Sequence, residues 1–589
     1  MAYPYEQTRW SLKDLADAPE GAEMESYLTQ LEENVAALEA ARPKLAPEIT
    51  EQDFLGVVDI FEEIYKVSTR LGAYTSLWFT EDTQNQAALN FMRRIEQVQT
   101  DASNRTLFFG QWFKDLPDEA AARLIASSDR IRYWLESIRR YKPYILSEAE
   151  EKIITLKDGH GMSALLKVYE MITNRFTFNL QVDGEVKSLT RDQLTSYYRH
   201  PSPDVRAATY RELYRVYGDN ATLLSEIYSH RVLDWRDEQL NLRGFSGPLS
   251  ARNFGNDLPD QVVDTLLVVC RQNNGLFQRY FKLKARLLGM DRLRRYDIYA
   301  PLAQSERKYE YSQAVEFVLS TFRNFSPHME KQALRVFLEG HLDAQVRPGK
   351  RGGAFCYSVL PELTPWVMVN YNGRARDMAT LAHELGHAVH GMQASSQPVM
   401  TFHASMPMAE TASVFAEMLL NDRLLREESD FSVRRDLLMH AIDDAYATVQ
   451  RQAYITLFER DAHRMLVENV PMEDLTKHYM ANLEEQFGDA VELSDEFKWE
   501  WVSIPHIYNS PFYTYAYSFG QLLVLALYQQ YRVQGQAFIS RYFKILSYGG
   551  SAAPAIVLEE AGLDISSPGF WQGGYDVLQS MVEELEEVI

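Results

Sequence analysis

The sequence contains very little cysteine, no long apolar run and no cluster of basic residues. Cys270 and Cys356 are its two cysteines in 589 residues, which excludes a disulfide framework and favours a reducing compartment. The longest apolar stretches, such as 522–527, are far shorter than the roughly 20 residues that a membrane helix needs. The first 13 residues contain no apolar core of a secretory signal. These absences predict a cytoplasmic protein without a membrane partner.

Acidic residues outnumber basic residues by 82 to 60, which gives a formal net charge of −22. Such a chain repels nucleic acid unless it has a basic patch, so a nucleic-acid partner is not expected. Hydrophobic residues make up 46% of the chain, which is too many for a disordered protein. Single hydrophobic cores stop growing near about 250–300 residues, so the length predicts more than one subdomain.

Most of the chain is predicted to be helical. In the segments 24–42 and 120–140, apolar residues recur every three or four positions, which is the pattern of an amphipathic helix. Strand patterns are few. The segment 175–188 alternates around Asp183–Gly184 and predicts a β-hairpin, and Trp366–Tyr371 predicts a second short strand. We expect a mainly α fold, divided into an N-terminal helical region, 1–195, and a larger region, 196–589.

Residues 380–391 read TLAHELGHAVHG and contain the chemically most informative motif of the chain. On a helix, His383 and His387 project from one face, one turn apart, so both imidazoles can reach a single zinc ion. Glu384 lies between them and is the residue that would activate water. Gly386 is a poor helix former, which makes sense where another segment must approach the helix closely. An ordinary helix with two surface histidines is the alternative.

A catalytic zinc usually has three protein ligands and one open position. The metzincin pattern is excluded, because its positions for Gly and His are occupied by His390 and Gln393. The segment 406–420 is predicted to be one helix and contains Glu410 and Glu417, seven residues apart. Glu410 is the better candidate for the third ligand, and Glu417 for a hydrogen-bond partner of a ligating imidazole. A solvated helix face is the alternative for either carboxylate.

A second informative segment lies near the C-terminus. Within twelve residues it contains His506, Tyr508, Tyr513, Tyr515 and Tyr517. Tyrosine hydroxyls and a histidine can donate hydrogen bonds to the oxyanion that forms when water adds to a peptide carbonyl. The alternative, in a chain with 34 tyrosines, is that the segment simply packs in a core.

HELGHAVH, followed 23 residues after His387 by Glu410 in the run ETAS, resembles the oligoendopeptidase F family of zinc peptidases, relatives of thimet oligopeptidase. The resemblance extends to KRGGAFCYSVLPELTPWVMVNYNG, DIYAPL and IPHIYNSPFYTYAY. It implies one zinc ion per chain, with His383, His387 and Glu410 as ligands and Glu384 as general base. It also implies a two-lobed helical body around a deep substrate channel, with a small β-sheet beside the zinc-binding helix.

The resemblance also implies roles for the C-terminal segment. His506 and Tyr515 are expected to stabilise the oxyanion, and Tyr508 and Tyr513 to contact the substrate. Which tyrosine of the segment faces the metal stays open at this point. Asn370 and Tyr371 end the short strand 366–371, and their backbone is expected to pair with an extended substrate if this strand is a sheet edge.

The sequence therefore predicts a zinc-dependent endopeptidase that hydrolyses internal bonds of short peptides through a metal-activated water, and that acts as a monomer. Two alternatives remain. A non-catalytic peptide-binding helical scaffold with a structural zinc would need neither Glu384 nor an open metal position. A zinc aminopeptidase would require a free amino group on its substrate.

Overall fold

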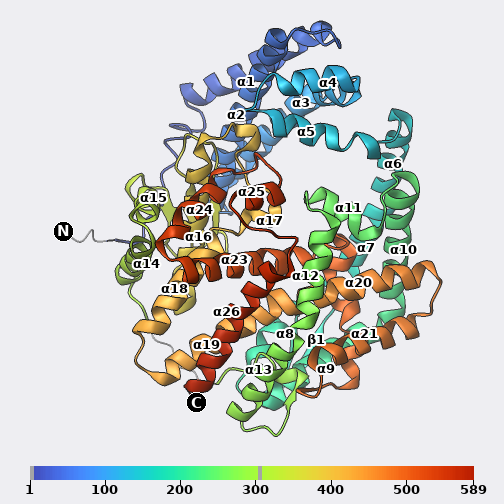
Figure 1. Ribbon diagram of the computed structural model, residues 1–589, viewed down its shortest axis with the longest axis vertical. Coiled ribbons are helices and arrows are strands. Elements are labelled where there is room, and N and C mark those ends of the chain that lie inside the picture. The colour runs from blue at the N-terminus through green and yellow to red at the C-terminus, as the bar shows by residue number, and fades with distance from the viewer. Residues whose placement is uncertain (1–4, 303–307, 589) are drawn as a thin grey trace. The chain divides into compact units, whose positions relative to one another are not determined.

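Helices form most of the protein in Figure 1, a computed structural model that describes residues 5–302 and 308–588. The prediction of a mainly α fold is confirmed. In the first half of the chain the helices are α1 (Ala22–Ala41), α2 (Glu51–Glu81), α3 (Gln86–Asp115), α4 (Asp118–Ala126), α5 (Arg132–Arg140), α6 (Glu148–His160), α7 (Met162–Asn174), α8 (Arg191–Thr195), α9 (Pro203–Asp219), α10 (Ala221–Trp235), α11 (Pro248–Gly255), α12 (Asp260–Gln272) and α13 (Asn274–Leu287).

The second half contains α14 (Tyr311–Phe325), α15 (Pro327–Leu338), α16 (Ala375–Gln393), α17 (Met406–Ala409), α18 (Ser413–Glu427), α19 (Phe431–Ala445), α20 (Arg451–Val467), α21 (Met472–Phe487), α22 (Pro505–Asn509), α23 (Tyr515–Gln534), α24 (Gln536–Ser547), α25 (Pro554–Glu560) and α26 (Pro568–Glu587). The strands are β1 (Phe178–Val182), β2 (Glu185–Leu189), β3 (Leu293–Arg294), β4 (Leu342–Asp343), β5 (Phe355–Tyr357), β6 (Trp366–Met368) and β7 (Val491–Glu492).

The chain divides into two compact units, each assembled from three separate stretches of sequence. Unit 1 consists of residues 1–143, 306–424 and 530–562, and unit 2 of residues 144–305, 425–529 and 563–589. The boundary expected between residues 195 and 196 falls inside unit 2, and the division into two regions at this point stays a prediction. The substrate channel also stays a prediction.

The core of unit 1 joins its N-terminal helices to a small sheet. In Figure 1, α1, α2 and α3 lie side by side in blue. Their apolar faces bury Phe54 and Phe113, whose ring centres are 5.9 Å apart. The same buried cluster includes Trp366 and Met368 of β6. Burial of aromatic side chains supplies much of the free energy of folding, so this continuous core fixes the sheet against the helices.

The three-stranded sheet of unit 1 has the strand order β4-β6-β5. β4 pairs with β6 in parallel, with Leu342 opposite Val367, and β5 pairs with β6 antiparallel, with Cys356 opposite Val367. β6 is therefore the central strand, because it has a partner on each side. The expectation that the strand at Trp366–Tyr371 is a sheet edge is wrong, and β5 is an edge strand instead.

Unit 2 contains the predicted hairpin, in which β1 and β2 pair antiparallel on either side of Asp183–Gly184. Asp183 and Gly184 both have positive φ angles, 54° and 83°, as a two-residue hairpin turn requires. In unit 1, the helix predicted over 120–140 is interrupted between α4 and α5 at 127–131. Its sequence, SSDRI, begins with residues whose side chains compete with the backbone for hydrogen bonds, which accounts for the interruption.

Candidate metal centre

Two imidazoles and one carboxylate converge on one face of α16 in unit 1. The ring centres of His383 and His387 are 4.8 Å apart. Oε2 of Glu410 lies 3.4 Å from Nε2 of His383 and 3.5 Å from Nε2 of His387. The three ligand atoms all lie within 4.8 Å of one another. The spacing of four residues on a helix brings the two imidazoles together, and the fold adds a carboxylate from a separate segment.

Gly386 allows that segment to reach the helix. A Cβ atom at this position would lie 2.6 Å from the carbonyl oxygen of Ala412 and 2.7 Å from Cα of Ser413, closer than real Cβ contacts. The prediction that Gly386 accommodates a close approach is confirmed. The expected single helix over 406–420 is wrong, because α17 ends at Ala409 and α18 begins at Ser413. The break turns the backbone at Glu410 so that the chain can pass over Gly386.

Hydrogen bonds orient the carboxylate and one imidazole. Ser413 donates its hydroxyl proton to Oε2 of Glu410 at 2.7 Å. Nδ1 of His383 donates to Oε1 of Glu417, because an ionised carboxylate only accepts. The proton therefore lies on Nδ1, and the lone pair of Nε2 faces Glu410. Burial lowers the pKa of His383, but the hydrogen bond with Glu417 and the nearby carboxylates of Glu417, Glu384 and Glu410 together outweigh burial, so the pKa is raised. The predicted pairing of Glu417 with an imidazole is confirmed.

Glu384 is almost fully buried beside the two histidines, with 6% of its surface exposed. It lines a cavity of about 550 Å³, together with the β5 residues Phe355 and Tyr357. Burial raises the pKa of Glu384 to about 7, against the opposing effect of His383. The site therefore places a carboxyl group next to the converging ligand atoms, in a space that can admit a small part of another molecule.

Other residues line the same cavity. His390 is buried, and burial lowers its pKa to about 4, so its imidazole is neutral near pH 7. His403 is exposed at the cavity wall. Cys356 also lines the cavity, and burial raises its pKa well above the usual value, so the thiol is protonated and unreactive.

Asn370 and Tyr371 follow β6 and are engaged within unit 1. The side-chain amide of Asn370 donates to the carbonyl oxygens of Arg351 and Gly353 at 3.1 and 2.9 Å. Tyr371 is buried, its hydroxyl donates to the carbonyl of Tyr309, and its own carbonyl accepts from Gln7. The backbone expected to pair with a substrate is thus occupied at Tyr371. The edge strand beside the histidines is β5, and a substrate role for Asn370 and Tyr371 stays a prediction.

The tyrosine segment belongs to unit 2, and the structure sorts its side chains by burial. Tyr508 and Tyr515 are both fully buried. The ring of Tyr508 stacks on Tyr169 with 4.2 Å between ring centres. The hydroxyl of Tyr515 accepts a hydrogen bond from the side-chain amide of Asn256 at 2.8 Å. In this structure both side chains pack inside unit 2, and their predicted roles stay predictions.

His506, Tyr513 and Tyr517 form a separate, partly exposed group in the same unit. The rings of His506 and Tyr513 are parallel, with 6.0 Å between centres, and the hydroxyl of Tyr517 lies 3.4 Å from Nε2 of His506. Tyr517 has 37% of its surface exposed. The sequence places Tyr517 eleven residues after His506, and this spacing alone does not predict their contact.

The buried side chain of Glu459 and two partly buried arginines bond the backbone between His506 and Tyr513. Phe512 has a φ angle of 58°, a left-handed conformation that is strained for a bulky residue. Its N–H donates to Oε1 of Glu459 at 2.8 Å, and the carbonyl of Pro511 accepts from Arg252 at 2.9 Å. The carbonyl of Tyr508 accepts from Arg231 at 3.0 Å. Sequence reasoning missed these three side chains, because an ionisable residue on a helix gives no sign that it will bond the backbone of a distant segment.

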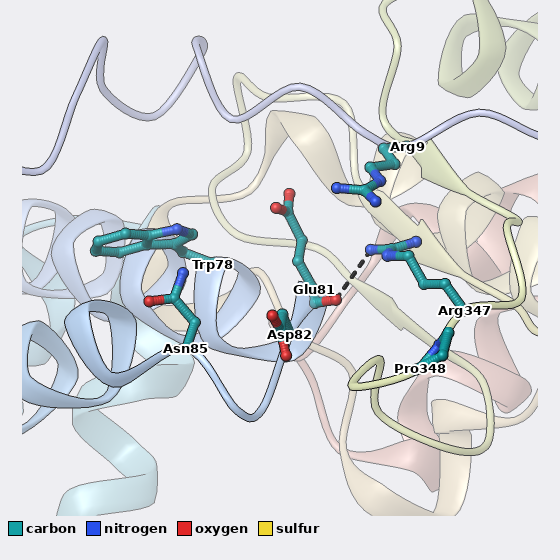
Figure 2. A pocket seen from close by; sticks show the side chains of 7 residues that line it. All are labelled: Arg9, Trp78, Glu81, Asp82, Asn85, Arg347 and Pro348. Atoms are coloured by element: carbon teal, nitrogen blue, oxygen red, sulfur yellow. Dashed lines mark hydrogen bonds between the residues drawn. The ribbon is translucent and has the colours of Figure 1, made fainter.

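A second pocket of unit 1, of about 170 Å³, lies among Arg9, Trp78, Glu81, Asp82, Asn85, Arg347 and Pro348. Figure 2 shows Arg347 reaching the backbone carbonyl of Glu81, a hydrogen bond of 3.1 Å. Arg347 also forms an ion pair with Asp343 at 2.7 Å, and Arg9 donates to Gln345. Its charged groups already have partners within the protein, so this pocket is not a candidate for catalysis.

The donor set at α16 fits zinc chemically. Zinc takes imidazole nitrogen and carboxylate oxygen at roughly 2.0–2.2 Å in a tetrahedron, which separates ligand atoms by about 3.3–3.6 Å. The distances of 3.4 and 3.5 Å from Glu410 to the two imidazoles lie in this range. Three protein ligands leave the fourth position of a tetrahedron open, as a catalytic site requires.

A mainly helical fold with a buried carboxyl beside a His–His–Glu group is the architecture of a metallopeptidase, and comparison with known proteins agrees. The family described as "Peptidase family M3" matches residues 196–577, and the one described as "Oligopeptidase F" matches residues 112–178. The first match covers more than half of the chain. The chain therefore belongs to peptidase family M3 and is a peptidase, and the resemblance to oligoendopeptidase F is confirmed.

Individual relatives extend along nearly the whole chain. Oligopeptidase PepF of Bacillus subtilis is 26% identical over 89% of this chain and 80% of its own length. A crystal structure of a Chlamydophila abortus protein described as a peptidase superposes with a TM-score of 0.92 at 23% identity, over 99% of this chain and 98% of that one. Oligoendopeptidase-F from Enterococcus faecium gives a TM-score of 0.70 at 23% identity, over 96% and 98%. The structural matches support the fold.

No helix among the described residues is both long enough and apolar enough to span a membrane.

Proposed function

We propose that this peptidase is a zinc-dependent endopeptidase that hydrolyses internal bonds of short peptides. The observation that carries the proposal is the convergence of His383, His387 and Glu410, whose ligand atoms lie within 4.8 Å of one another next to the buried Glu384. A structural zinc would need no such carboxyl and no adjoining cavity, so this observation favours catalysis over a non-catalytic scaffold.

His383, His387 and Glu410 would hold one catalytic zinc ion per chain. When bound, the ion polarises the scissile carbonyl and lowers the pKa of a water molecule. Glu417 fixes the tautomer of His383, since its carboxylate accepts the Nδ1 proton and leaves Nε2 free for the metal. Ser413 restrains the carboxylate of Glu410 by a hydrogen bond. Both contacts preorganise the ligands, so less conformational entropy is lost when the metal binds.

Glu384 would act as the general base. Its carboxylate takes a proton from the attacking water as the water adds to the peptide carbonyl, and the same carboxyl then gives the proton to the leaving amine. The scissile C–N bond breaks, and a carboxylate and an amine are the products. Glu384 follows His383 directly in α16, so one helix carries the proposed base and both imidazole ligands.

We further propose that His506 and Tyr515 stabilise the oxyanion and that Tyr508, Tyr513, Asn370 and Tyr371 contact the substrate. The partial exposure of His506 and Tyr513 supports accessible donors in this segment. The protein is proposed to be a cytoplasmic monomer, with an N-terminal region, 1–195, and a catalytic region, 196–589.

The test combines metal analysis with a quenched-fluorescent peptide assay on the wild type and on Glu384→Gln. Gln keeps the size of the side chain and cannot take a proton, so zinc content should be unchanged while kcat falls by about 10²–10⁴-fold. A variant that keeps more than about a tenth of the wild-type kcat contradicts the assignment of the base. Zinc-loaded wild type without peptidase activity would instead support the alternative of a non-catalytic peptide-binding scaffold.

A further inference from the structure

A second group of one histidine and two carboxylates lies elsewhere in unit 1. Asp14 belongs to the N-terminal segment, Glu339 follows the last residue of α15, and His341 immediately precedes β4. One ligand atom from each of the three lies within 4.8 Å of the others. No part of the proposed peptidase mechanism uses these residues.

The imidazole of His341 is held rigidly. It is 1% exposed, and its ring stacks on Trp366 with 3.9 Å between ring centres. Its Nδ1 lies 2.8 Å from the carbonyl oxygen of Thr364. A carbonyl only accepts hydrogen bonds, so Nδ1 carries a proton. In the neutral imidazole, Nε2 then carries a lone pair, and the packing of the ring fixes the direction of that lone pair.

That lone pair faces another acceptor. Nε2 of His341 is buried and has no hydrogen-bond partner among the described residues, yet Oδ2 of Asp14 lies 3.3 Å away. Two acceptors at this distance repel each other unless a proton or a cation lies between them. A cation between them would satisfy both the buried nitrogen and the carboxylate oxygen.

Glu339 supplies a third ligand. Arg335 donates to its Oε1 at 2.9 Å, and a carboxylate has further lone pairs on both oxygens, so this ion pair and a metal bond are compatible. The N–O separation of 3.3 Å between His341 and Asp14 is close to the 3.4 and 3.5 Å at the α16 site. It fits ligand atoms that share one tetrahedral ion at roughly 2.0–2.2 Å.

We propose that Asp14, Glu339 and His341 bind a second divalent transition-metal cation, of which zinc is the best-matched example. The imidazole ligand disfavours Mg²⁺ and Ca²⁺, which prefer oxygen ligands. The ion would be structural. It would link the N-terminal segment to the turn between α15 and β4, where Ser11 already donates its N–H to the carbonyl of Gly340 at 2.7 Å.

The test titrates zinc into full-length protein that has been stripped of metal. The starting variant is Glu410→Ala, which removes a ligand of the α16 site and leaves the second group intact. Asp14→Asn is then added to this variant. Asp17→Asn, added separately, is the matched control, because Asp17 is an exposed carboxylate of the same segment that lies outside the group. His341 is left unchanged, since its stacking on Trp366 makes its replacement a risk to folding.

Glu410→Ala should bind one equivalent of zinc tightly, and zinc should raise its Tm. Addition of Asp14→Asn should weaken this binding by at least about 10-fold and remove the Tm increase, whereas Asp17→Asn should change neither. Equal zinc affinity with and without Asp14→Asn would overturn the proposal. So would ¹⁵N chemical shifts showing that His341 is protonated on both nitrogens in the presence of zinc. The peptidase proposal is tested independently, by the peptide assay on the wild type and on Glu384→Gln.

Discussion

The imidazole of His383 contacts two carboxylates for which the proposed function implies different roles. Its Nδ1 donates to Glu417, and its Nε2 faces Glu410 at 3.4 Å. If the site binds zinc as proposed, removal of Glu410 takes away a ligand, whereas removal of Glu417 leaves three ligands and loosens only the orientation of one. The two residues therefore differ in a measurable way, although both are glutamates seven residues apart.

We expect Glu410→Ala to lose the zinc ion of the α16 site on dialysis, which leaves only the equivalent proposed at Asp14, Glu339 and His341. Glu417→Ala should retain the α16 ion with an affinity lower by about 10–100-fold, as is typical when a partner of a ligand is removed. Metal content after dialysis against a series of chelator concentrations measures both. Equal retention in the two variants, or the reverse order, would exclude Glu410 as the third ligand.

The hydroxyls of Tyr515 and Tyr513 lie in different environments. If Tyr515 stabilises the oxyanion, Tyr515→Phe should lower kcat by about 10²–10³-fold with little change in KM, because the charge appears only in the transition state. Tyr515→Phe also removes the acceptor of the Asn256 amide, so Tm must be measured in parallel. Tyr513→Phe is the control. A larger loss of kcat in Tyr513→Phe would show that the partly exposed tyrosine has the role.

At the scale of the element, α16 and the turn between α17 and α18 must touch at Gly386. Gly386→Ala would place Cβ 2.6 Å from the carbonyl oxygen of Ala412, so the two segments would have to separate. Because Glu410 lies on the displaced segment, zinc affinity should fall by at least about 10-fold while the helical circular dichroism is retained.

Gly56→Ala in α2 is the matched control for Gly386→Ala. A Cβ atom at Gly56 meets nothing within 4 Å, so this change should leave zinc affinity unaltered and raise stability by up to about 1 kcal/mol through helix propensity. Wild-type zinc affinity in Gly386→Ala would mean that the close approach does not hold the third ligand in place.

The backbone at Phe512 depends on a buried acid in α20. Burial raises the pKa of Glu459 to about 8, although the Phe512 N–H, Arg252 and Arg231 oppose the shift. The folded state thus binds the proton more tightly than the unfolded state, whose carboxyl titrates near 4.5. This contribution to stability is complete below about pH 4.5 and is lost as the pH rises through 8, by up to about 1.4 kcal/mol per pH unit.

Glu459→Gln keeps an acceptor for Phe512 and has no charge to gain. The Tm of the wild type should therefore fall relative to that of Glu459→Gln between about pH 4.5 and 8, and the difference should level off above pH 8. Glu468→Gln, at an exposed carboxylate just beyond the same helix, should follow the wild type throughout. Parallel Tm curves for the wild type and Glu459→Gln would mean that Glu459 is ionised in the folded protein.

At the scale of the whole molecule, the proposed function implies a limit on substrate size. Short peptides should be cut at internal bonds, with acetylated and free N-termini treated alike, while folded proteins should be cut far more slowly. Mass spectrometry of the products and kcat/KM for matched acetylated and free peptides measure this. A strict requirement for a free N-terminus would identify an aminopeptidase, and comparable kcat/KM for a folded protein would exclude a narrow channel.

The sequence by itself determined the helical fold class and the pair His383 and His387, because both depend on local periodicity. Residues four apart on a helix share a face whatever surrounds them. It also predicted a close contact at Gly386, because a glycine within a helix costs stability unless something requires it. These inferences need no knowledge of which segments meet in space.

Only the tertiary structure decided the rest. The break before α18 arises because the chain passes over Gly386, and nothing local to 406–420 signals it. The central position of β6 depends on its pairing with β4 and β5, which come from two other segments. Asp14 and His341 are more than 300 residues apart in sequence, yet they lie 3.3 Å from each other. Contacts between distant segments depend on how whole faces pack, and local sequence patterns contain no record of that packing.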